Sequence, residues 1–153
     1  GEKFLPDGFA ITNAILDYTA QQQGVEVRRG DYLLVHTGHV ERCLTNASWD
    51  GYSGGDAPGF AFETVDWLHG KEIAGVATDT WGAEVRPNET PDTTQPWHWI
   101  AIPIMGLTVG EIFNLTELAA DCAKDKVYEF LFVAPALPIT GAVGSPVTPL
   151  ASK

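Results

Sequence analysis

The stretch IAGVATDTW (residues 73–81) contains the feature that decides the fold class. Its first six residues are small and apolar with no polar alternation, which is typical of a strand buried on both faces of a sheet. Helical and strand-like patterns alternate on either side of it. Strands that alternate with helices predict a domain of the α/β class.

The neighbouring segments supply the other predicted elements. Apolar residues at helical spacing predict helices at residues 11–23, ended by Gly24, and at 62–69, ended by Gly70. Strand patterns occur at residues 25–27, 32–36, 107–109 and 128–134. Asn114 and Glu117 resemble a capping box that opens a helix over residues 115–124. Residues 37–59 and 81–95 are typical of loops, and a loop as long as the second is more often functional than not.

Composition limits the classes of partner. The chain has 153 residues, which suits a single domain over residues 1–153, and 9 basic against 20 acidic residues give a net charge of −11. A surface of that charge repels phosphate backbones and anionic lipid, so we expect neither nucleic acid nor membrane as a partner. We see no signal peptide or bilayer-length apolar run, and we expect a cytoplasmic protein. Because the chain begins at Gly1, we expect a processed end, the remnant of a tag or a break within a longer protein.

The segment PWHWIAIPIMGLTVGEIFNL (residues 96–115) carries the candidate metal ligands, His98 and Glu111. Imidazole nitrogen and carboxylate oxygen are both good ligands for zinc or manganese. A helix and the strand that follows it, joined by a turn, could bring the two side chains to one point. Spacing alone leaves the other reading open, in which both residues only stand beside a core, because catalytic zinc usually takes three protein ligands.

Four further residues are candidates for contact with a substrate or for support of the ligands. Asp79 and Thr80 follow the buried strand, where Asp79 either caps the next loop or faces a ligand. His39 lies in TGH after another strand and is either a solvated loop histidine or a ligand-facing one. Trp97 is either a core residue or part of an apolar wall beside His98.

Several ordered blocks of the chain resemble the cyclase family of metal-dependent hydrolases. The blocks are DYLLVHTGH, the run from SWDGYSGGDAPGF to TDTWGAEV, PWHWIAIPIMGLTVGEIFNL, and VYEFLFVAP to GSPVTPLA. The resemblance implies a swivelling β/β/α-type fold and a divalent metal, zinc or manganese. It also implies a small-molecule substrate in which an amide, formamide, cyclic amide or lactone bond is hydrolysed by metal-activated water. The histidine and the glutamate of the family's C-terminal half correspond to His98 and Glu111.

One departure from the family pattern is large. The motif H-x-G-T-H-x-D, which supplies the other ligands, is absent, since His36 and His39 do not have its spacing. The general acid/base histidine belongs to the same N-terminal part, so the catalytic residues of this chain are unknown. We therefore expect the chain to be the C-terminal portion of such a hydrolase, inactive alone, with weak or no metal binding. A half-domain of this kind should associate with its missing N-terminal half or form homo-oligomers.

The alternative is a non-catalytic domain that has lost the ligand motif and binds a small ligand or acts as a scaffold. The tryptophans at positions 81, 97 and 99 could then form an apolar pocket.

Overall fold

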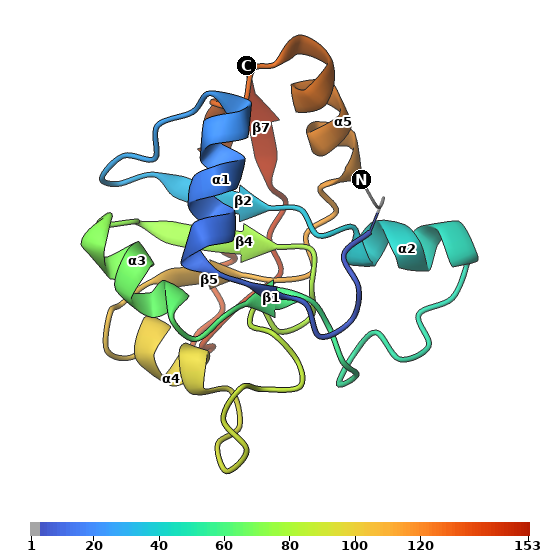
Figure 1. Ribbon diagram of the computed structural model, residues 1–153, viewed down its shortest axis with the longest axis vertical. Coiled ribbons are helices and arrows are strands. Elements are labelled where there is room, and N and C mark those ends of the chain that lie inside the picture. Colours follow the sequence, from blue (N-terminus) through green and yellow to red (C-terminus); the bar gives the residue numbers. More distant parts are fainter. Residues whose placement is uncertain (1–3) are drawn as a thin grey trace.

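Strand β4 (Gly75–Thr78) is the middle strand of a parallel three-stranded sheet with the order β2-β4-β5 (Figure 1). All four of its residues are buried, as the uninterrupted apolar run predicted. The structure, a computed structural model, describes residues 4–153. It confirms the predicted α/β class with parallel strands.

Helices and strands alternate along most of the chain. In order they are β1 (Ala10–Ile11), α1 (Asn13–Gln23), β2 (Tyr32–Val35), α2 (His39–Asn46), β3 (Gly59–Phe60), α3 (Thr64–Gly70), β4, α4 (Pro96–Ala101), β5 (Thr108–Gly110), α5 (Thr116–Asp125), β6 (Leu131–Val133) and β7 (Leu150–Ser152). Strands β1 and β3 form a second, parallel pair, and β6 and β7 form an antiparallel pair.

Helices cover both faces of the central sheet. Leu33 and Val35 of β2 pack into the main core cluster, which also contains residues of α1, α3 and α4. Tyr32 and Leu34, which alternate with them, pack against a separate cluster that includes Leu118 of α5. Because alternate residues of a strand point to opposite faces, α5 lies on the opposite side of the sheet from α1.

The pairing of β2 with β4 depends on a glycine. Tyr32 is the register partner of Gly75, and a Cβ atom at position 75 would collide with the Tyr32 ring. The aromatic ring therefore lies directly over the β4 backbone. A side chain at position 75 would displace the ring and loosen the edge of the sheet.

The structure differs from the sequence predictions in three places. The predicted capping box does not form, because the N-cap of α5 is Leu115, whose side chain makes no capping hydrogen bond. Helix α2 lies inside the segment expected to be a loop, and it buries His39, Val40 and Cys43 on one face. Its N-cap is Gly38 in the left-handed region, with no side-chain cap, so the usual serine or aspartate start signal is missing. Residues 25–27 form no strand; the Val25 N–H bonds back to Ala20 O and completes the end of α1.

Within residues 4–153, none of the helices has the length and apolar character needed to cross a lipid bilayer.

Candidate functional site

Helix α4 delivers His98 to the site. Pro96 opens the helix at its first position, where the missing N–H costs nothing. Successive helical residues are rotated by about 100°, so Trp97, His98 and Trp99 point in three directions. Trp97 is fully buried, the His98 side chain is 17% exposed and Trp99 is 66% exposed. The helix therefore anchors itself through Trp97 and presents His98 at the border of the core.

Strand β5 delivers Glu111, the residue that follows its last position. Beyond the strand, backbone N–H groups continue to bond to the end of β4, from Ile112 to Thr80 O (3.0 Å) and from Phe113 to Thr78 O (3.0 Å). These two bonds hold the chain directly after Glu111, and the pairing of Gly110 with Ala77 holds it directly before. Glu111 is thereby fixed in place while its side chain stays 32% exposed.

The structure brings His98 and Glu111 together. His98 Nε2 lies 3.0 Å from Glu111 Oε1. On the other side of the ring, His98 Nδ1 lies 2.6 Å from Glu84 Oε1. The imidazole therefore stands between two carboxylates, one almost fully buried (Glu84, 3% exposed) and one partly open to solvent (Glu111).

Glu84 is the site residue that sequence reasoning missed. Its carboxylate also accepts the backbone N–H groups of Trp97 and His98, each at 3.3 Å, and Asn88 donates to it at 3.0 Å. It thus satisfies donors at the N-terminus of α4, which have no partner within the helix. Glu84 lies in a polar loop without periodicity, and no local pattern identifies which loop carboxylate reaches the helix.

The charge of His98 follows from these neighbours. Burial alone lowers its pKa, but the hydrogen bonds and charges of Glu111 and Glu84 together raise the pKa to about 9. At neutral pH the metal-free site therefore holds an imidazolium between two carboxylates. The protonated Nε2 then donates to Glu111 Oε1.

Asp79 and Thr80 lie at the end of β4 and are fully buried. The Asp79 carboxylate accepts hydrogen bonds from Thr37 N (2.8 Å), Thr37 Oγ1 (2.7 Å) and Gly38 N (2.8 Å). It therefore has a structural role, but it fixes the turn that starts α2 and not the loop after β4 that the capping alternative named. The Thr80 hydroxyl pairs with that of Thr78 at 2.8 Å. A role for either residue in substrate contact stays a prediction.

His39 and Trp97 are both core residues in this structure. His39 is 2% exposed, so it is not a solvated loop histidine, and its ring packs 4.8 Å from the ring of Tyr52. Burial, followed by the charge of Arg42, lowers its pKa. Trp97 stacks on Phe60 with ring centroids 5.3 Å apart. Among residues 4–153, neither side chain makes a hydrogen bond or an ion pair with Glu111.

The three tryptophans that could have formed an apolar pocket have different surroundings. The buried Trp97 indole donates to Thr64 Oγ1 at 2.9 Å. The Trp81 indole donates to Gly55 O at 3.1 Å, and Trp99 is largely exposed. Their arrangement does not support the pocket expected for a non-catalytic binding domain.

The residues fit one side of a metal site. A metal-binding histidine usually donates its other ring N–H to a carboxylate, which fixes the tautomer, and Glu84 is placed to accept from Nδ1. His98 Nε2 and Glu111 Oε1 then face each other as the two atoms that could bind the metal. Across residues 4–153, however, no group of three or more His, Cys, Asp or Glu side chains could hold a metal ion. Further ligands would have to come from outside the described residues.

A family model described as "Putative cyclase" matches residues 2–85, which is more than half of the chain. The chain belongs to the cyclase family. The family match includes Glu84 and the block TDTW, but it ends before His98 and Glu111.

Solved structures extend the comparison to nearly the whole chain. A crystal structure described as a novel cyclase is 37% identical, with a TM-score of 0.83 over 98% of this chain and 49% of its own. An isatin hydrolase bound to the product analogue thioisatinate is 21% identical (TM-score 0.71), with 95% of this chain and 53% of its own chain covered. Isatin hydrolase A from Ralstonia solanacearum is also 21% identical (TM-score 0.74), with the same coverage of 95% and 53%. No curated protein matches the chain.

These similarities confirm the predicted fold as that of the cyclase family. The chain spans about half the length of the solved structures that it matches.

Proposed function

We propose that this chain is part of a cyclase-family hydrolase and supplies His98 and Glu111 as ligands of a divalent metal, zinc or manganese. The substrate would be a small molecule with an amide, formamide, cyclic amide or lactone bond. The observation that carries the proposal is the line of three side chains, with Glu84 on one ring nitrogen of His98 and Glu111 facing the other. Family membership and the similarity to isatin hydrolases support the reaction class.

The chain's own residues would prepare the site before any metal binds. Glu84 would hold the proton on Nδ1, so that Nε2 presents its lone pair toward Glu111 once its own proton has left. Trp97, buried beside the ring, would exclude water from one side and strengthen polar contacts there. A metal bound there would supply a Lewis acid that lowers the pKa of water and polarises a carbonyl oxygen.

The remaining ligands and the general acid/base histidine would lie on polypeptide outside this chain. Two observations support this. Residues 4–153 contain no group of three or more possible metal ligands, and the chain matches only about half the length of the solved structures. The chain alone would then be inactive, and the assembled enzyme would work without a membrane or nucleic-acid partner, in the cytoplasm.

The ligand assignment can be tested by NMR titration of the histidine rings with ZnCl₂. We expect the His98 ring signals to shift first and Glu111→Ala to weaken that response at least tenfold, and in His98→Ala no remaining histidine ring should respond with the wild-type affinity. His69→Ala, at the end of α3, is the matched control and should leave the response unchanged. A wild-type titration in which the other histidines respond as strongly as His98 would show that the assignment is wrong.

The alternative, a binding or scaffold domain, rests on the absence of a three-residue metal cluster among residues 4–153. It predicts no selective response of His98 to Zn²⁺. The same titration therefore separates the two proposals.

A further inference from the structure

Strand β2 is at the edge of the central sheet. It pairs with β4 on one side, and the sheet order β2-β4-β5 places no described strand on its other side. An edge strand presents unpaired backbone N–H and C=O groups to any strand that can reach it. The side chains around this edge decide which kind of segment can pair with it.

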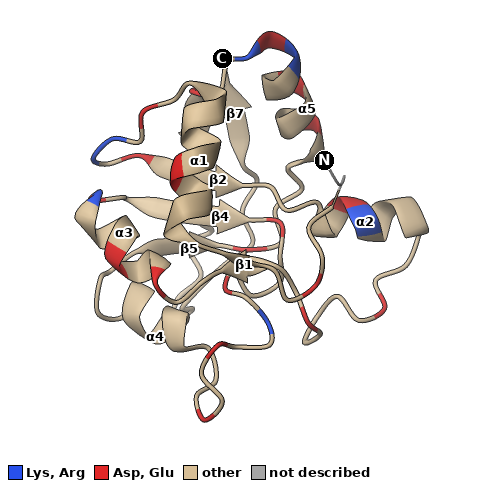
Figure 2. Ribbon diagram, viewed as in Figure 1, with Lys and Arg blue, Asp and Glu red and all other residues tan. Residues whose placement is uncertain are grey.

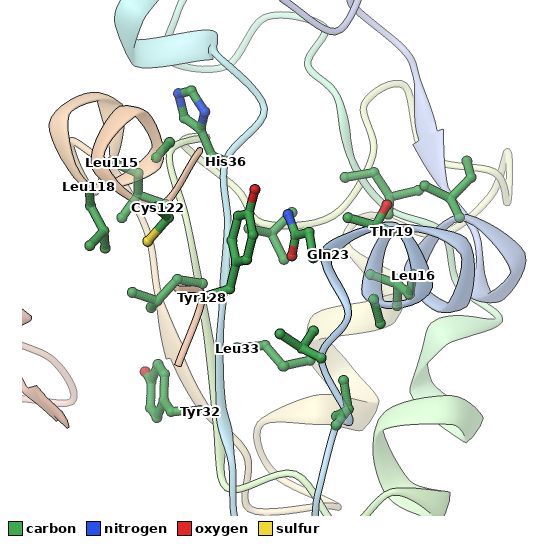
Figure 3. A pocket seen from close by; sticks show the side chains of 18 of the residues that line it. Leu16, Thr19, Gln23, Tyr32, Leu33, His36, Leu115, Leu118, Cys122 and Tyr128 are labelled. Carbon is green, nitrogen blue, oxygen red and sulfur yellow. The ribbon is translucent and has the colours of Figure 1, made fainter. Parts of the chain in front are cut away.

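A groove of about 540 Å³ runs along this edge. Figure 3 shows β2 between the two helices, with Leu16, Thr19 and Gln23 coming from α1 and Leu118 and Cys122 from α5. The helices lie on opposite faces of the sheet, so their side chains form two walls with the strand edge at the bottom. The groove therefore has the shape of a slot that extends the plane of the sheet.

The lining of the groove is uncharged apart from the titratable His36. In a chain with a net charge of −11, this surface has no Asp, Glu, Lys or Arg (Figure 2 shows acidic residues on many other segments). A charged occupant would therefore find no Asp, Glu, Lys or Arg side chain to pair with here.

The two helices are incompletely covered. Helix α1 has no fully buried residue, and α5 has one, Cys122. Both helices would bury apolar area if an element filled the space between them. A single apolar strand would therefore pair with the free edge of β2 and also cover the apolar side chains of α1 and α5.

We infer that the groove binds a β-strand from the half of the cyclase fold that this chain does not contain. The strand would pair with Tyr32–Val35 and extend the sheet beyond β2, between α1 and α5. Because it would be covered on both faces, it should be apolar on both faces, as β4 is. The 37%-identical cyclase has a chain about twice as long, so its fold contains elements with no counterpart here.

A second copy of this chain fits the groove less well. Its own β2 edge lies at the bottom of the same slot, between the same two helices. Two such recessed edges could not approach each other without a clash of helices. A strand with no flanking helix of its own reaches the edge without this clash. The inference does not depend on the metal proposal, because none of the three residues of the His98 site lines the groove.

The test uses the chain co-produced with the part of the 37%-identical cyclase that it does not match, so that neither polypeptide must fold alone. We expect a one-to-one complex and new amide protection over residues 32–35 by hydrogen exchange. Gln23→Glu and Ala123→Glu, which place a charge in the groove, should weaken the complex at least tenfold.

Matched controls lie on the same helices outside the groove lining. Gln22→Glu and Ala120→Glu introduce the same charge and should leave the complex intact. Failure to form a complex, or equal effects of groove and control variants, would overturn the inference. It would also be overturned if the chain alone formed a dimer that the groove variants dissociate, because the occupant would then be a second copy.

Discussion

At the residue scale, Glu84 has two tasks in one carboxylate. It accepts the first N–H groups of α4, and it holds the Nδ1 side of the His98 ring. Asn88 supports it from the same loop. The orientation of the candidate ligand is therefore set by a residue that also stabilises the helix on which the ligand stands.

Glu84→Gln should weaken metal binding at His98 without unfolding the chain. The amide can still accept from the helix but no longer carries the charge that favours a proton on Nδ1. Loss of such a supporting carboxylate typically costs roughly 10–100-fold in metal affinity. Zn²⁺ titration followed at the His98 ring measures the effect, and the exposed Glu117→Gln serves as the control. Equal affinities for Glu84→Gln and wild type would refute this role.

His39 predicts a dependence of stability on pH. Its pKa is lowered in the folded chain, mainly by burial, whereas an unfolded histidine titrates near 6.5. Below that pH the unfolded state binds more protons than the native state, so the free energy of unfolding falls as the pH drops. Urea unfolding from pH 7.5 to 5 should show wild type losing more free energy of unfolding than His39→Gln. Parallel pH curves for the two proteins would contradict the prediction.

At the scale of elements, α4 is held by one aromatic anchor. The Trp97 ring stacks on Phe60, and its indole N–H reaches Thr64 of α3 at 2.9 Å. Only six residues form the helix, so its own hydrogen bonds contribute little. Packing of Trp97 therefore decides whether His98 stays in position.

Trp97→Phe should destabilise the chain by about 2 kcal/mol, because it leaves a cavity and removes the hydrogen bond from the indole to Thr64 Oγ1, which then keeps its bond to Ala61 O. Trp99→Phe, two residues along the same helix, should cost about 0.5 kcal/mol or less because that side chain is exposed. Chemical denaturation of the two variants gives the comparison. Similar losses for both would show that α4 is not anchored through Trp97.

The elements that the sequence predicted well have strong local patterns. Residues 73–78 form an apolar run that local reasoning recognises, and Gly24 ends α1 in the left-handed conformation expected of a helix stop. Helix α2 was missed because its buried face consists of His39, Val40 and Cys43 in a polar, glycine-rich context. Glu84 was missed for a different reason, since its partners lie 13 and 14 residues further on and are fixed only by tertiary packing.

At the scale of the whole molecule, the chain matches about half the length of a cyclase-family structure and carries two candidate metal ligands. The paired residues His98 and Glu111 lie at the carboxyl end of the β4–β5 pair, while the uncharged groove follows the β2 edge. The two surfaces would both be completed by polypeptide that this chain lacks.

Activity should therefore require both halves. We expect no hydrolysis of N-formyl anilines or isatin-like cyclic amides by the chain alone, and metal-dependent hydrolysis by the complex with the unmatched half of the 37%-identical cyclase. His98→Ala in the complex should reduce the rate at least a hundredfold, whereas His69→Ala should retain it. A complex that forms but stays inactive with zinc and with manganese would argue against the hydrolase and leave the groove inference intact.

The double role of Glu84 also has a consequence for local unfolding. Any fluctuation that breaks the Trp97 and His98 N–H bonds to this carboxylate also releases the His98 ring from its orientation. Opening of the first turn of α4 and loss of the ligand geometry are then one event. A cation that binds only the oriented ring should slow amide exchange at residues 97 and 98. The expected factor is one plus the ratio of the cation concentration to its Kd. Amide exchange at the start of α4 and metal affinity at His98 thus depend on the same opening equilibrium of this turn.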